Sequence, residues 1–287
     1  MVKNFLVSLL LSTILFSSSV IISQSKNKIL PYPVLQYKMQ NGLNVVTVPF
    51  ESPGIAAFYI IVRSGARNEV EKGVTGFAHF FEHMMFRGTE KYSKEQYEAV
   101  LKSIGASANA NTSSDRTVYH MVGNVDKLEL MFEVESDRFQ NLKYPEHDFK
   151  TEAGAVKGEY TKNYADPMSR LNENIYNTAF VAHTYKHTTI GFLEDIIDMP
   201  NQYQYSLKYY DRYYRPEYCT VLVVGDVKRV TEGCEQFGRA EHGREVCAER
   251  RRDLTRDDEL AATERFAEPA HSRPFLRLML PGFIFAL

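Results

Sequence analysis

The pentapeptide His79-Phe80-Phe81-Glu82-His83 constrains this chain more than any other stretch. Two histidines four residues apart lie on one face of a helix and can bind one metal ion together. Glu82 stands beside them, where its carboxylate can accept a proton from water at the metal. Apolar residues surround the motif and indicate a buried helix between residues 73 and 87, with Gly88 as its C-terminal cap. A third ligand must come from another element, because a catalytic zinc site holds three protein ligands and a water.

Two acidic residues, Glu152 and Glu159, are the candidates for that third ligand. They lie on a helix that the sequence predicts over residues 146–164, and being seven residues apart they face the same way. Two turns separate them by roughly 10 Å along the axis, so only one can sit at the level of the metal. The other can lie behind the metal ligands and influence the site by a hydrogen bond to a ligand or through its charge. Spacing alone does not choose between them.

Two further sets of potential ligands receive no metal. His183 and His187 are also four residues apart, but their Thr-rich surroundings do not look helical, so we expect them to be structural. The cysteines form neither a disulfide framework nor a zinc-knuckle pattern, and we expect ordinary thiols at Cys219, Cys234 and Cys247.

The order of predicted elements gives the fold class. An Asn41-Gly42 turn joins two strands, and a capping box at Ser93 begins a helix that Gly105 ends. The remaining patterns alternate in blocks of strands and helices. We therefore predict an α+β fold, a mostly antiparallel sheet with helices packed on one face, present in a single copy. The predicted strands are 34–38, 43–49, 55–62, 106–112, 116–122 and 219–224, and the further helices are 125–142, 146–164, 167–180 and 202–213.

Residues 1–25 have the features of a secretory signal peptide: Lys3, an apolar run and small residues before a cleavage site near Ser25 or Ser19. A membrane anchor is the rival interpretation, but serines interrupt the apolar run, which is short for a span. The segment has no Arg, which argues against a mitochondrial transit peptide. We therefore expect an extracytoplasmic protein, periplasmic or secreted.

Composition changes abruptly after Lys228. Up to that residue the chain has 16 Lys and 8 Arg, and beyond it 10 Arg and no Lys. Residues 229–287 are either a disordered linker with an apolar end or the product of a frameshift. We favour the frameshift and assign this tail no function, which leaves residues 26–228 as one catalytic domain. The net charge of −2 argues against a nucleic-acid partner.

The stretch from Gly76 to Thr89 resembles the zinc helix of the pitrilysin/insulinase family of inverted zinc peptidases, which includes mitochondrial processing peptidase. The resemblance extends from about Leu35 to Asp226 and takes in residues 105–119, 151–159, 187–191 and 214–216. It implies one zinc ion per chain, held by His79, His83 and Glu159, with Glu82 as general base. It also places Glu152 at the family's acidic partner position.

The resemblance further implies a substrate: an extended polypeptide that pairs with the backbone at Asn109 and Ala110 as an added strand. The function implied is that of a zinc endopeptidase acting through a zinc-activated water.

Family members normally carry a second, similar domain that closes over the first, and this sequence has no second copy of the pattern. A partner subunit or a missing second domain would complete the enzyme, and a homodimer is a further arrangement to consider. The alternative function is a non-catalytic or half-enzyme subunit of the same fold that needs a partner domain, and a module with purely structural zinc is a third.

Overall fold

The computed structural model describes residues 30–39 and 41–227. The predicted signal segment 1–25 and the tail 229–287, with Cys234 and Cys247, lie outside the described residues. Within the described ranges no helix has both the length and the hydropathy needed to cross a bilayer.

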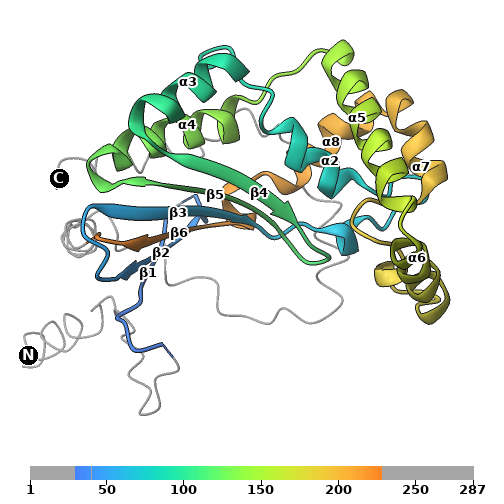
Figure 1. The fold of residues 1–287 in the computed structure, drawn as a ribbon, viewed down its shortest axis with the longest axis horizontal. Coiled ribbons are helices and arrows are strands. Elements are labelled where there is room, and N and C mark those ends of the chain that lie inside the picture. Colours follow the sequence, from blue (N-terminus) through green and yellow to red (C-terminus); the bar gives the residue numbers. More distant parts are fainter. Residues whose placement is uncertain (1–29, 40, 228–287) are drawn as a thin grey trace, which may run out of the picture.

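One six-stranded sheet organises the described part of the chain, in the order β1-β2-β6-β3-β5-β4 (Figure 1). All neighbouring pairs are antiparallel except β2 and β6, which run parallel. The mostly antiparallel α+β prediction is therefore confirmed. The strands are β1 (Leu35–Lys38), β2 (Asn44–Pro49), β3 (Ile55–Val62), β4 (Ser107–Thr112), β5 (Thr117–Asn124) and β6 (Cys219–Gly225).

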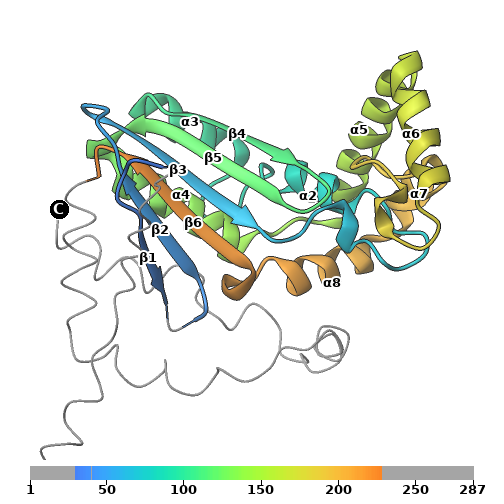
Figure 2. The ribbon, with the colours of Figure 1, turned by 90° about the horizontal axis from the view of Figure 1, so that it is seen from below.

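Seven α-helices accompany this sheet in the described residues. Figures 1 and 2 show α3 and α4 over one face, while α2 and α5 to α8 gather at one end of the strands. The helices are α2 (Phe77–Met84), α3 (Lys94–Ile104), α4 (Leu128–Asn141), α5 (Glu146–Tyr164), α6 (Pro167–Ala179), α7 (Leu193–Asp198) and α8 (Tyr203–Tyr213). Short 3-10 turns precede or follow several of them, among them Ala66–Asn68 and Thr184–Lys186.

Strand β6 occupies a position that no local pattern could predict. It is the last strand of the described residues, yet it lies between β2 and β3, with Val221 opposite both Val45 and Ile60. All three side chains are fully buried. This insertion joins the β1–β2 hairpin to the β3–β5–β4 unit, and it leaves β4 at the edge of the sheet.

Aromatic side chains fill the space between the sheet and α2. Phe81 stacks on Tyr209 of α8 with ring centroids 5.1 Å apart, and Phe80 meets Phe149 of α5 edge to face. Tyr119 of β5 donates a hydrogen bond to the backbone oxygen of Phe81. Each fully buried aromatic side chain contributes about 1.5–3 kcal/mol of burial energy, so α2 is held firmly against three different elements.

Two local predictions need correction. Helix α2 ends at Met84 with Met85 as its C-cap, so Gly88 does not cap it. Gly88 instead has a φ of +98°, and a Cβ there would lie 2.7 Å from the backbone oxygen of Tyr92. It therefore allows a tight turn into the segment before α3. Helix α7 was not predicted, because its six residues are too few to show a helical period.

Candidate metal centre

Helix α2 carries its apolar residues on one face and its potential metal ligands on the other. Its buried residues are Phe77, Ala78, Phe80, Phe81 and Met84. The remaining three, His79, Glu82 and His83, are only partly buried and share the opposite face at spacings of three and four. Burial of the aromatic face therefore fixes the direction in which both imidazoles and the carboxylate point.

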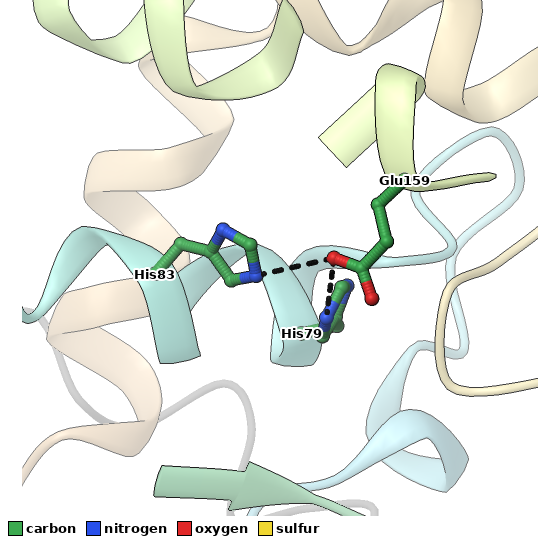
Figure 3. Close-up of side chains that lie close together, drawn as sticks. All are labelled: His79, His83 and Glu159. Atoms are coloured by element: carbon green, nitrogen blue, oxygen red, sulfur yellow. Dashed lines mark ion pairs between the residues drawn. The ribbon is translucent and has the colours of Figure 1, made fainter. Parts of the chain in front are cut away.

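Helix α5 crosses α2 and brings Glu159 to the two histidines (Figure 3). Its Oε2 atom lies 3.5 Å from Nε2 of His79 and 3.5 Å from Nε2 of His83. These separations are too long for good hydrogen bonds, so the three atoms converge without satisfying one another.

The spacing of these donor atoms fits a tetrahedral zinc ion. One ligand atom from each of the three residues lies within 4.8 Å of the others. Ligands about 2.1 Å from a tetrahedral zinc stand roughly 3.4 Å apart, close to the spacings observed. Two imidazoles and one carboxylate are also the donor set of known catalytic zinc sites. Within residues 30–39 and 41–227 this is the single cluster of its kind.

Glu152 lies behind His83. Its Oε1 atom is 2.8 Å from Nδ1 of His83, and Arg87 donates from Nε to Oε2 at 2.5 Å. The bond to Nδ1 holds the ring so that Nε2 faces Glu159. The structure thus puts Glu159 at the cluster and Glu152 behind it, which spacing alone had left open. Arg87 was not anticipated from the sequence, because nothing local connects it with a residue on α5.

The two histidines differ in proton affinity. Burial lowers the pKa of His79, although the negative charge of Glu159 opposes this. The hydrogen bond that His83 donates to Glu152 is the main cause that raises the pKa of His83. Burial raises the pKa of Glu152, but hydrogen bonds from His83 and Arg87 outweigh it and leave that pKa lowered. A metal must therefore displace a proton more readily held by His83 than by His79.

Glu82 faces the edge strand. Thr112, the last residue of β4, donates its hydroxyl to Oε2 of Glu82 at 2.6 Å. Asn109 and Ala110 lie on the same strand, which pairs only with β5 among the described strands. Asn109 is exposed and the Ala110 side chain is buried, as alternation along a strand requires. Sequence reasoning missed Thr112, although it fell inside a segment singled out for the substrate.

A buried carboxylate that the sequence analysis also missed lies at the start of α2. Glu69 accepts hydrogen bonds from the backbone N–H groups of Gly76, at 2.8 Å, and Ala78, at 2.7 Å. Burial raises its pKa from 4.5 to about 8, despite these bonds. His187, expected to be structural, is buried beside it with Nδ1 3.7 Å from Oε2 of Glu69. Neither His183 nor His187 joins the cluster of His79, His83 and Glu159.

Comparison with known proteins gives one consistent result. Residues 45–191 match the family described as insulinase, peptidase family M16. The zinc protease PqqE of Helicobacter pylori is 33% identical over 191 residues, which is 66% of this chain and 42% of that protein. The β subunit of the mitochondrial processing peptidase of Rattus norvegicus is 31% identical over 55% of this chain and 32% of its own length.

Solved structures agree in fold. A protease from Helicobacter pylori superposes with a TM-score of 0.66 at 32% identity, over 69% of this chain and 47% of that one. The first half of the periplasmic protease PqqL from Escherichia coli gives a TM-score of 0.59 at 24% identity, over 68% of this chain and 43% of that one, a likeness of fold alone. The chain thus spans less than half the length of these relatives.

The raised pKa of Glu69 predicts a pH dependence of stability. The folded protein binds this proton more tightly than the unfolded chain, because the folded pKa of about 8 exceeds 4.5. Its contribution is complete below the unfolded pKa and is lost as the pH rises through the folded one. Relative to Glu69→Gln, the wild type should lose up to about 1.4 kcal/mol of unfolding free energy per pH unit between about pH 5 and about pH 8. Urea denaturation across this range measures the difference.

The exposed Glu98→Gln change on α3 serves as the control, and its profile should follow that of the wild type. Parallel profiles for the wild type and Glu69→Gln would contradict the assignment of this proton to Glu69.

Proposed function

The chain belongs to the insulinase family of peptidases, M16, and on that premise we propose that it is a zinc-dependent endopeptidase acting on extended polypeptides. One observation carries the proposal. Glu159 of α5 converges with His79 and His83 on the less buried face of α2, the face that also carries Glu82. Relatives named zinc proteases support zinc as the cofactor.

The proposed ligands are His79, His83 and Glu159, for one zinc ion per chain. When bound, zinc supplies a Lewis acid that polarises the scissile carbonyl and acidifies water. Glu152 keeps the ring of His83 aligned, and Arg87 keeps Glu152 in place. The proposal gives these two residues no contact with substrate.

Glu82 is the proposed general base. It accepts the proton of the attacking water and later delivers it to the leaving amine. The hydroxyl of Thr112 donates to one carboxylate oxygen, which leaves the other free to take the proton. The same hydrogen bond holds Glu82 next to the last residue of β4.

Strand β4 is the proposed substrate platform. A peptide added along its free edge would pair with the backbone near Asn109 and Ala110, leading toward Thr112 and hence Glu82. Backbone pairing accepts any sequence in extended form, which suits a peptidase whose substrates are unfolded segments.

A second half is part of the proposal. The chain covers 42% of the Helicobacter pylori protease PqqE and 47% of the related solved structure. We propose that another domain, a partner subunit or a second copy of this chain closes over the face that carries Glu82. A non-catalytic subunit is less well supported, because both histidines and Glu82 of the motif are present, and so is Glu159.

The proposed domain limits and cellular location are inferred from the sequence. We propose residues 26–228 as the catalytic domain and residues 1–25 as a signal peptide, giving a periplasmic or secreted protein. The tail 229–287 has no role in the proposal.

Removal of the base or of the metal tests the reaction. The substrate is an unstructured fluorogenic polypeptide. A chelator should abolish hydrolysis and added zinc should restore it. Glu82→Gln should slow hydrolysis by a factor of about 10²–10⁴ while zinc content stays at one per chain, because only proton transfer is lost. Glu98→Gln is the matched control with an exposed carboxylate.

Chelator-resistant hydrolysis, or full activity in Glu82→Gln, would contradict the assignment. An inert wild type that binds one zinc would point to the half-enzyme alternative, and the remaining domain should then restore activity.

Metal affinity separates the two glutamates of α5. Competition with a chromogenic chelator should show that Glu159→Gln weakens zinc binding by more than about 100-fold, since a ligand is lost. Glu152→Gln should weaken it by about 10–100-fold, because only the orientation of His83 is lost. Glu146→Gln, at the exposed start of the same helix, should have no effect. A larger loss at Glu152 than at Glu159 would reverse the two roles.

Backbone methylation of the substrate tests the added strand. Along an extended peptide only alternate N–H groups face the edge of β4. Methylation of successive amides should therefore raise KM in an alternating pattern, with little effect at every second position. A uniform or absent effect across the series would exclude strand addition as the binding mode.

A further inference from the structure

Helix α2 lacks a side-chain cap of its own. Its N-cap residue is Gly76, in the left-handed region with a φ of +94°, and offers no side-chain acceptor to the first turn. The open N–H groups of a first turn need partners, and a buried start without them is costly. Two of the N–H groups at this end, those of Gly76 and Ala78, point instead to the carboxylate of Glu69.

Glu69 meets both groups from outside the helix. Each of its oxygens accepts one hydrogen bond, at 2.8 Å and 2.7 Å, and its side chain is fully buried. Above its pKa of about 8, the ionised carboxylate would also interact favourably with the helix dipole. The contact therefore fixes where α2 begins.

The segment after α6 closes over the same point. Asp195 accepts from the backbone N–H and hydroxyl of Thr75, the residue before Gly76. The backbones of Gly191 and Gly76 lie very close together: a Cβ on Gly191 would lie 2.8 Å from the Gly76 nitrogen. The stretch from His187 to Gly191, prominent in the sequence but absent from the metal cluster, thus covers Glu69 and the helix start.

The two histidines of the cluster are held in different ways. Nδ1 of His83 is bound to Glu152, which fixes the ring directly. Nδ1 of His79 is buried and, among the described residues, has no hydrogen-bond partner. His79 is the third residue of α2 and lies in its first turn. The position of its ring therefore depends on the backbone of that turn.

We propose that Glu69 is a positioning residue for His79, which it holds in place as a metal ligand by binding the first turn of α2. This inference rests on the proposed metal site. Glu69 touches neither the ligands nor the substrate edge, and it acts through the N–H groups of Gly76 and Ala78. Glu69 would thus orient His79 through the backbone, whereas Glu152 orients His83 by a direct hydrogen bond to its ring.

Zinc affinity of the full chain tests this inference, measured by chelator competition with zinc alone and no substrate. Glu69→Ala removes both acceptors and should weaken zinc binding about tenfold or more. Glu69→Gln keeps the shape and one carbonyl acceptor, and should give a smaller loss. Ser93→Ala is the matched control, because it removes the cap of α3, whose hydroxyl accepts from the N–H of Gln96. That variant should lose stability but keep wild-type zinc affinity.

Amide hydrogen exchange of the metal-free proteins gives a second measurement. The N–H groups of Gly76 and Ala78 should lose protection in both Glu69 variants and keep it in Ser93→Ala. A folded Glu69 variant with wild-type zinc affinity would overturn the inference, and so would an equal loss of affinity in Ser93→Ala. If Glu69→Ala does not fold, Glu69→Gln decides by the same criterion.

The inference and the proposed function fail in different ways. A wild type that binds no zinc would overturn the proposed metal site and this inference with it. A wild type that binds zinc, together with a Glu69→Gln variant that binds it equally well, would overturn the inference alone.

Discussion

Burial of the aromatic face of α2 is the constraint on which the site depends. Phe77, Phe80 and Phe81 pack against aromatic residues of two other helices, α5 and α8, and none of them can turn outward without opening the core. A helix with one face fixed in this way has no rotational freedom left. His79, Glu82 and His83 must then share the other face. The packing of the core therefore also fixes the directions in which these three side chains point.

Three carboxylates from outside α2 complete that geometry. Glu159 joins the histidines, Glu152 orients His83, and Glu69 binds the start of the helix. Each is compensated in its own way: by the two imidazoles, by Arg87, and by backbone N–H groups together with a raised pKa. Glu69 and Glu152 are buried, and a buried carboxylate without such partners would be expensive.

Local signals predicted most elements, and long-range contacts account for what was missed. The capping box at Ser93 and the Gly105 cap fix α3 through neighbours in sequence, and both are confirmed. The place of β6 within the sheet depends on strand pairing across the whole chain, which no local pattern encodes. Helical spacing left the choice between Glu152 and Glu159 open for a similar reason: it gives a shared face but not the point at which α5 crosses α2. Arg87, Thr112 and Glu69 act through contacts 30 or more residues away, or through backbone N–H groups, and leave no motif.

The hydrogen bond between Thr112 and Glu82 links the edge strand of the sheet to the face of α2 that carries the histidines, and this has a mechanistic consequence. Thr112 ends the edge strand and donates to Glu82, so the proposed base is tied to the strand along which a substrate would lie. A site supported by regular elements holds its groups more accurately than one built on loops. In the proposed binding mode, the distance from the substrate backbone to the base would be set by the register of β4 on β5, with Thr112 opposite Thr117. Placement of a bound peptide would then need no movement of α2, and a second domain would serve to close the site, not to assemble it.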